Sequence, residues 1–148
     1  MAKILIIHGP NLNLLGSREK DIYGTATLET IDQNLMQLAK EYKLEIECFQ
    51  SNVEGFIVDK LHEQKELADF VIINPAAFTH TSVAIRDALL AIGKPFIETH
   101  LSNPVKRETF RQVSYISDVA YGIISGFGAK SYELAMHAAI DYCHNHCV

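Results

Sequence analysis

The chain has 148 residues, a net charge of −5, 48% apolar residues and 21% charged residues. This length suits one domain, residues 1–148, with a sizeable core. The negative charge disfavours nucleic-acid binding and membrane binding, so an anionic substrate would need local arginines. Three scattered cysteines do not make a disulfide framework, and the first residues match neither a signal peptide nor a membrane span. We therefore expect a cytoplasmic protein.

Short apolar runs alternate with stretches of helical periodicity along the chain. The expected strands are 3–7, 44–49, 70–73, 95–99 and 119–124. Helices are expected at 28–42, at 84–92 with its end at Gly93, and at 131–146. Another helix is expected to open with a capping-box pattern at 51–54 and to continue through Leu61. A short helix is expected from Pro104 through Arg111.

The alternation of strands and helices indicates a mainly parallel sheet with helices on both faces. Five such units in this length favour an α/β, flavodoxin-like three-layer sandwich with strand order 2-1-3-4-5. In such a sheet, ligands bind beyond the carboxyl ends of the strands. Three segments follow those ends, 8–24, 74–81 and 98–103, and they carry Asn11, Arg18, Tyr23, Asn74, His80, His100 and Ser102.

Tyr23 lies in the long loop after the first strand, five residues beyond Arg18. A tyrosine of this kind is either a packing residue or a general base. As a base it needs a pKa lowered toward neutrality, and the permanent charge of Arg18 would favour the phenolate. The alternative for Arg18 is a solvated surface charge.

His100 follows the fourth strand, two residues after Glu98. The period of two in a strand lets both side chains project to the same side. A carboxylate beside an imidazole favours the charged, proton-donating form, which suits a general acid. The alternative is a half-buried histidine with no chemical role.

Other polar groups at this edge have both a structural and a functional interpretation. His80 and Asn74 could belong to capping and turn structures or face a ligand. The backbone amides of Leu101 and Ser102 precede the expected helix at Pro104 and could bind a carboxylate. Arg107 and Arg111 could share the same pocket, or one could be a surface charge.

Three motif matches fail on inspection. The segment 126–131 has alanine where a P-loop needs glycine, and it follows the last strand. No Gly-x-Gly-x-x-Gly follows the first strand, which weighs against a dinucleotide site. The histidines and cysteines of 143–147 have no second ligand cluster, so we expect no metal there.

With these residues identified, the chain resembles the type II 3-dehydroquinate dehydratases (type II dehydroquinases) almost from end to end. Three segments carry the resemblance, in order and at matching spacing: 9–16 with Arg18-Glu19 and Tyr23-Gly24, then 74–88, then 98–103. The resemblance implies dehydration of 3-dehydroquinate to 3-dehydroshikimate in the shikimate pathway, without metal or organic cofactor. It also implies a homododecamer built as a tetramer of trimers.

The resemblance also implies roles at individual positions. Tyr23 would be the base, Arg18 would keep it ionised, Asn11 would position a water at the enolate oxygen, and His100 would be the acid, oriented by Glu98. Asn74 with the Leu101-Ser102 backbone would hold the substrate carboxylate, His80 and Arg111 would hold ring hydroxyls, and Asp87 would complete the site of a neighbouring subunit.

The chain departs from the usual family pattern at a few positions, none of them proposed as catalytic. His8 replaces a more familiar asparagine, Lys20 a proline, and Ala76 and Ser131 replace glycines, while 104–106 differs before Arg107. Lys20 could make the loop more flexible.

Three other functions fit this fold class. A receiver-like signalling module would need acidic residues after the first strand and an aspartate ending the third, where this chain has 8–11 and Asn74. A flavin-binding electron carrier would need a Ser/Thr-rich phosphate loop, which 8–24 lacks. An enzymatically silent relative used for binding would not need the base and acid positions.

Overall fold

The computed structural model describes residues 1–17 and 19–147, with the side chains of Lys20 and Tyr23 outside that description. Its strands are β1 (Lys3–His8), β2 (Glu45–Gln50), β3 (Phe70–Asn74), β4 (Phe96–His100) and β5 (Gly122–Ser125). Its α-helices are α1 (Lys20–Tyr23), α2 (Leu28–Glu41), α3 (Glu54–Glu63), α4 (Val83–Ile92) and α5 (Lys130–His146). Short 3₁₀ helices are η1 (Leu12–Leu14), η2 (Ala76–His80), η3 (Pro104–Lys106), η4 (Thr109–Gln112) and η5 (Ser117–Val119).

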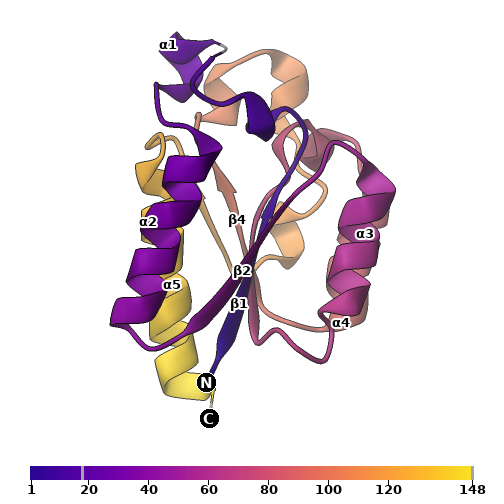
Figure 1. Ribbon diagram of the computed structural model, residues 1–148. Coiled ribbons are helices and arrows are strands. Elements are labelled where there is room, and N and C mark those ends of the chain that lie inside the picture. Colours follow the sequence, from indigo (N-terminus) through magenta and orange to yellow (C-terminus); the bar gives the residue numbers. More distant parts are fainter. Residues whose placement is uncertain (18, 148) are drawn as a thin grey trace.

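The five strands form one parallel sheet in the order β2-β1-β3-β4-β5, which confirms the predicted order and fold class. Helices α2 and α5 cover one face of this sheet, and α3 and α4 cover the other (Figure 1). The carboxyl ends of the strands lie at the top of this view, beneath α1, and both termini lie at the opposite end. The two-sided cover explains why the central strands β1 and β3 carry long apolar runs, since the middle of a parallel sheet is buried on both faces.

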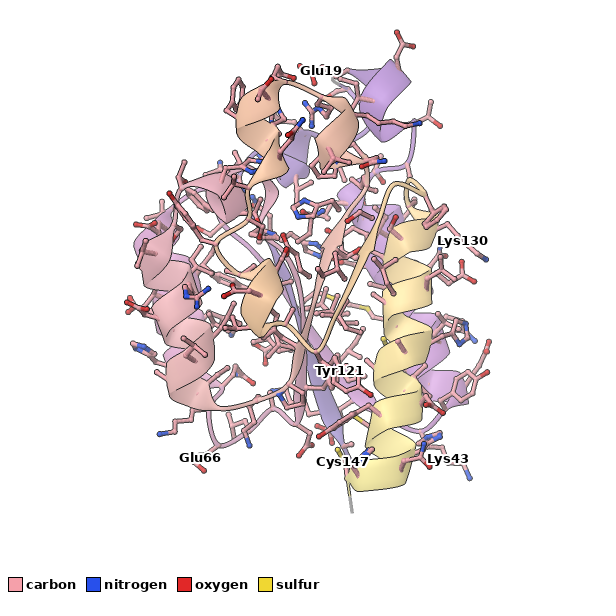
Figure 2. The ribbon with its side chains drawn as sticks, turned by 180° about the vertical axis from the view of Figure 1, so that it is seen from behind. Glu19, Lys43, Glu66, Tyr121, Lys130 and Cys147 are labelled. Atoms are coloured by element: carbon pink, nitrogen blue, oxygen red, sulfur yellow. The ribbon has the colours of Figure 1, made fainter. Side chains whose placement is uncertain are left out.

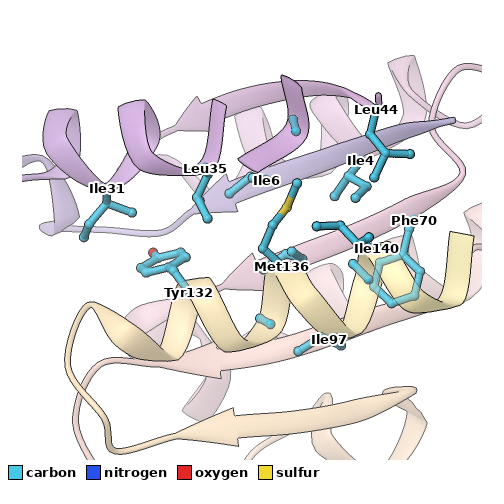
Figure 3. Packing of buried hydrophobic residues seen from close by; sticks show 14 of the residues in the cluster. Ile4, Ile6, Ile31, Leu35, Leu44, Phe70, Ile97, Tyr132, Met136 and Ile140 are labelled. Atoms are coloured by element: carbon cyan, nitrogen blue, oxygen red, sulfur yellow. The ribbon is translucent and has the colours of Figure 1, made fainter. Parts of the chain in front are cut away.

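The core alternates along each strand. Ile4 and Ile6 of β1 face α2 and α5, whereas Leu5 and Ile7 face α3 and α4. Figure 3 shows the first of these layers, where Met136 and other α5 side chains pack against the sheet. By the same alternation the last residue of β1, His8, falls on the α2/α5 face.

The capping-box prediction at 51–54 is wrong. Ser51 Oγ accepts a hydrogen bond from the N–H of Val53 at 2.9 Å, which closes a local turn, and Val53 becomes the N-cap of α3 without a side-chain cap. The capping box forms instead at α2, between Thr27 and Thr30.

The short helix predicted from Pro104 through Arg111 is also wrong. Two 3₁₀ helices, η3 and η4, occupy this segment, because Arg107 between them has an extended backbone (φ −98°, ψ −156°). The fifth strand begins later than predicted, at Gly122, because Ser117–Val119 form the 3₁₀ helix η5. The side chain of Ser117 in this helix donates a hydrogen bond to Glu98.

Candidate active site

A cavity opens at the carboxyl edge of the sheet, where segments after three strands converge. It is lined by Pro10, Asn11, Leu12, Asn74, Ala76, Ala77, His80, His100, Leu101, Ser102, Pro104, Arg107 and Arg111. The loops after β1, β3 and β4 supply this lining, as the sequence predicted from the rule for parallel sheets.

His100 and Glu98 form a buried pair at the end of β4. The ring Nε2 of His100 lies 2.7 Å from Glu98 Oε2. A carboxylate only accepts, so Nε2 carries a proton and donates it, which leaves Nδ1 for the cavity that His100 lines. The period-two prediction of a shared side is confirmed by this contact.

Three hydroxyl groups also contact the carboxylate of Glu98. The side chains of Thr79, Ser114 and Ser117 hydrogen-bond its carboxylate, with Ser114 at 3.0 Å. Burial by itself raises the pKa of Glu98, but the hydrogen bonds from His100, Ser117 and Thr79 outweigh it and hold the pKa below its ordinary value. The carboxylate therefore stays ionised beside His100.

His80 lies in η2 with its ring fixed by the backbone. Its Nδ1 is 2.7 Å from the carbonyl oxygen of Val113, so Nδ1 is the donor. This contact leaves Nε2 for a ligand, and the ring lines the cavity. The helix that follows His80, α4, is capped by Ser82, whose Oγ accepts from the N–H of Ile85 at 2.9 Å.

The loops after β1 and β3 are packed directly on one another. Gly9 donates its N–H to the carbonyl of Asn74 at 2.7 Å, and a Cβ on Gly9 would come within 2.6 Å of the carbonyl carbon of Pro75. The next residue, Ala76, has a positive φ of 51°, which glycine adopts more easily than alanine. Its N–H donates to Asn74 Oδ1 at 3.0 Å and holds that amide at the cavity wall.

Asn11 reaches the cavity from a left-handed backbone conformation, with φ of 68°. Asparagine tolerates this conformation better than most residues. Its N–H donates to Asn52 Oδ1 at 2.9 Å, which fixes the loop against the segment after β2.

Two arginines make the cavity wall cationic. Arg107 and Arg111 both line it, and their side chains are only 15% and 22% exposed. Arg107 hydrogen-bonds Ser102 Oγ at 3.3 Å and lies 3.8 Å from Glu19, which ties the loop after β1 to the segment after β4. Both arginines thus face the pocket, which resolves the alternative that one is a surface charge.

Two predicted site side chains lie outside the described part of the chain, and a third, Asp87, does not line this cavity. Arg18 lies outside the described residues, as does the side chain of Tyr23, although the backbone of α1 lies over the carboxyl edge (Figure 1). Asp87 is exposed on α4 and does not line the cavity. Leu101 and Ser102 do line it, but η3 is only three residues long and offers little helix dipole for an anion.

Sequence reasoning missed the three hydroxyls around Glu98. Thr79 lies in segment 74–81, which the sequence analysis had placed at the ligand-binding edge, so a polar role for Thr79 could have been predicted. Ser114 and Ser117 follow no motif, and only the fold brings them to β4.

One cluster among the described residues has the composition of a metal site. The ligand atoms of His8, Asp32 and Cys48 lie within 4.8 Å of one another, below the cavity. Both ring nitrogens of His8 already have hydrogen-bond partners, Tyr132 and Asp32, each at 2.7 Å. These hydrogen bonds account for the cluster without an ion.

The fold and the site together define a flavodoxin-like α/β enzyme, with a cationic cavity and a carboxylate-paired histidine at the sheet edge. Residues 2–140 match the family model described as dehydroquinase class II. The chain belongs to this family.

Individual relatives agree with this assignment over nearly the whole chain. The chain is 60% identical to the 3-dehydroquinate dehydratase of Hahella chejuensis, covering 95% of this chain and 97% of the relative. It is 55% identical to the same enzyme of Pasteurella multocida, with 96% of each chain covered. The crystal structure of a type II dehydroquinase from Butyrivibrio crossotus superposes with a TM-score of 0.91 at 44% identity, covering 95% of this chain and 97% of that one. Within the described residues, no helix has the length and apolar character needed to cross a membrane.

Proposed function

We propose that this chain dehydrates 3-dehydroquinate to 3-dehydroshikimate, with Tyr23 as the base and His100 as the acid. The substrate is a small polyhydroxylated anion, and the chain carries a net charge of −5. The observation that carries the proposal is the His100–Glu98 pair beside a wall of two arginines, because an acid and an anion-binding surface then meet in one cavity.

The reaction begins with removal of a proton from the carbon beside the ketone. Tyr23, as the phenolate, takes that proton, and the electrons of the C–H bond move to the carbonyl oxygen to give an enolate. Arg18 keeps the phenol ionised through its permanent charge. A water held by Asn11 donates to the enolate oxygen, an oxyanion-hole role.

The second step is loss of the β-hydroxyl group. The enolate re-forms the ketone, the new carbon–carbon double bond expels the hydroxyl, and His100 Nδ1 gives it a proton so that water leaves. Glu98 hydrogen-bonds Nε2 of the same ring, so it fixes the ring orientation and leaves Nδ1 for the cavity.

The remaining residues hold the substrate. Asn74 and the backbone of Leu101 and Ser102 bind its carboxylate, while His80 and Arg111 bind ring hydroxyls. The support is that all five residues line the same cavity as His100. Arg107 adds a second positive charge to that wall and suits the anionic substrate.

We also propose that residues 1–148 form a single domain, that the chain assembles as a homododecamer of four trimers, and that it works in the cytoplasm. All five strands belong to one sheet, which supports the single domain. Asp87 is exposed on α4 between two exposed apolar residues, as expected of a residue that completes a neighbour's site. The three cysteines are free thiols, as in a reducing compartment.

The test is incubation with 3-dehydroquinate, following the conjugated enone of the product in the ultraviolet. Tyr23→Phe should abolish turnover while the variant still binds substrate, and His100→Ala should slow turnover by about 100-fold or more. Tyr121→Phe and His62→Ala, which alter exposed residues away from the cavity, are the matched controls. Absence of turnover by the unmodified chain would refute the proposed reaction, and near-normal rates in either variant would refute that residue's role.

A further inference from the structure

Four hydrogen-bond donors converge on the carboxylate of Glu98, which is only 1% exposed. Its Oε2 accepts from Nε2 of His100 at 2.7 Å and from the hydroxyl of Thr79. Its Oε1 accepts from the hydroxyl of Ser117. The hydroxyl of Ser114 lies 3.1 Å from Oε1 and 3.0 Å from Oε2, so it donates between the two oxygens. Of these four donors only His100 lines the cavity.

The backbone around Ser114 decides which way these hydroxyls donate. Ser114 Oγ accepts from the N–H of Ile116 at 3.2 Å and from the N–H of Ser117 at 3.1 Å. A hydroxyl has two acceptor sites and one proton, so both acceptor sites of Ser114 are used and its proton is left to donate. Thr79 Oγ1 also lies 2.8 Å from Ser114 Oγ, but it finds no free acceptor site there. The proton of Thr79 therefore goes to Glu98.

These donors leave no place for a proton on Glu98. A carboxylate offers about four lone-pair sites, and the four donors use them. Protonation would deprive one donor of its acceptor inside a buried site, which is unfavourable. The same hydrogen bonds hold the pKa of Glu98 below its ordinary value. Glu98 therefore accepts a hydrogen bond from His100 and does not take the proton itself.

We infer that the three hydroxyls are positioning groups that keep Glu98 an ionised acceptor for His100 Nε2, so that the ring gives and regains its proton at Nδ1 alone. The inference rests on the proposed function, because it takes His100 to be the acid. In each turnover the proton that Tyr23 gains equals the proton that His100 loses, so the ring recovers its proton from the cavity side and not through Glu98.

The first test compares two substitutions at Thr79 that separate its hydroxyl from its packing. Thr79→Val keeps the shape and removes the hydroxyl, so we expect kcat to fall about tenfold while KM for 3-dehydroquinate stays within about twofold. Thr79→Ser keeps the hydroxyl and should retain kcat within about twofold. A near-normal kcat in Thr79→Val, or an equal loss in Thr79→Ser, would overturn the inference.

The matched control is Thr99→Val on the same strand. Thr99 is fully buried between Glu98 and His100 in sequence, and its side chain projects to the opposite face of the sheet. Its Oγ1 has no hydrogen-bond partner among the described residues. Thr99→Val should therefore keep the wild-type kcat and KM, which shows that loss of a buried hydroxyl from β4 is not by itself harmful.

Ser117→Ala gives a second route, should Thr79→Val fail to fold. It removes another donor to Glu98 and should lower kcat in the same way. Ser114 is left intact in these tests, because its Oγ also accepts two backbone N–H groups. If the hydroxyl of Ser117 acts through Glu98, Ser117→Ala should change kcat by less than about twofold in a Glu98→Gln background. Multiplied losses in that double variant would overturn the inference.

A spectroscopic readout separates this inference from the reaction itself. In ¹⁵N-labelled protein, a pH titration of His100 reports which ring nitrogen loses its proton. In wild type we expect the Nδ1 signal alone to make the large shift of deprotonation, whereas both nitrogens should share that shift in Thr79→Val or Ser117→Ala.

Other charged and titratable side chains share a cavity with His100 among the described residues: His80, Arg107 and Arg111. The arginines keep their charge over the titration, and His80 has ring signals of its own. If wild type does not turn over 3-dehydroquinate, the proposed function fails while this titration still tests the role of the hydroxyls. Loss of the Nε2 proton in wild type, or titration at Nδ1 alone in both hydroxyl variants, would overturn the inference.

Discussion

Gly9 shows how a single missing side chain sets the shape of the cavity. Its N–H bonds the Asn74 carbonyl, and a Cβ at this position would come within 2.6 Å of the Pro75 carbonyl carbon. No flexible side chain is available to yield there, because the clashing atoms are backbone. We expect Gly9→Ala to lower the free energy of unfolding by about 2–3 kcal/mol, the cost typical of overpacking. Urea denaturation with linear extrapolation measures it.

The matched control is Gly55→Ala in α3, where an added Cβ meets no atom within 4 Å. Alanine is favoured over glycine in a helix, so this variant should be neutral or more stable by up to about 1 kcal/mol. Equal unfolding midpoints for the two variants would contradict the steric argument.

The sequence predicts the site best where local geometry decides it. His100 and Glu98 are two residues apart in a strand, and that spacing alone predicts their shared side. Ser114 and Ser117 lie 16 and 19 residues from Glu98, and isolated serines carry no signal of a buried partner. His8 gives a similar lesson, since its contact with Tyr132 spans 124 residues and depends on how α5 packs.

At the scale of elements, Glu98 joins β4 to η2 and η5 through hydrogen bonds to Thr79 and Ser117. The pKa of Glu98 is lower in the folded chain than its ordinary 4.5. The ionised carboxylate therefore contributes stability that is complete above that ordinary value and is lost as the pH falls through the folded pKa. Glu98→Gln, which cannot ionise, should lower the free energy of unfolding by about 2 kcal/mol near neutrality.

The pH dependence of that difference is the decisive measurement. Urea unfolding measures the free energy of unfolding of wild type and of Glu98→Gln. The difference between the two should be constant above about pH 5 and should become smaller below pH 4.5. Glu66→Gln, at the far end of the molecule from Glu19 in Figure 2, is the control and should show no such narrowing. If the difference in unfolding free energy stays constant down to about pH 3, the charge of Glu98 does not stabilise the contacts of β4 with η2 and η5.

Element boundaries were predictable only where the deciding contacts are local. The end of α4 at Gly93 is confirmed, and it needs only the left-handed conformation of that glycine (φ 67°). The segment from Pro104 to Arg111 contains a favourable helix start, yet Arg107 is extended there and its side chain contacts Ser102 and Glu19. Such tertiary contacts override the local helix propensity, and no sequence pattern predicts them.

At the scale of the whole molecule, alternation of strands and helices was enough to predict the sheet order. Parallel strands need crossover helices, and the right-handed crossover rule leaves few arrangements. What this reasoning does not supply is how copies of the chain meet. The proposal of a dodecamer therefore needs a physical test on the surface that carries Asp87.

Apolar side chains and a carboxylate alternate along the exposed side of helix α4. Val83 is 54% exposed, Leu90 is 52% exposed, and Asp87 lies between them at helical spacing. Apolar side chains flanking a carboxylate suit a contact with another copy, where charges introduced beside them would be desolvated. We expect the double variant Val83→Glu, Leu90→Glu to sediment as a smaller species than wild type and to lose activity as its Asp87 leaves the neighbouring site. Met36→Glu, an equally exposed position on α2, should keep the wild-type assembly. Sedimentation equilibrium measures the mass of each assembly. An unchanged mass for the double variant would mean that α4 does not form the subunit contact.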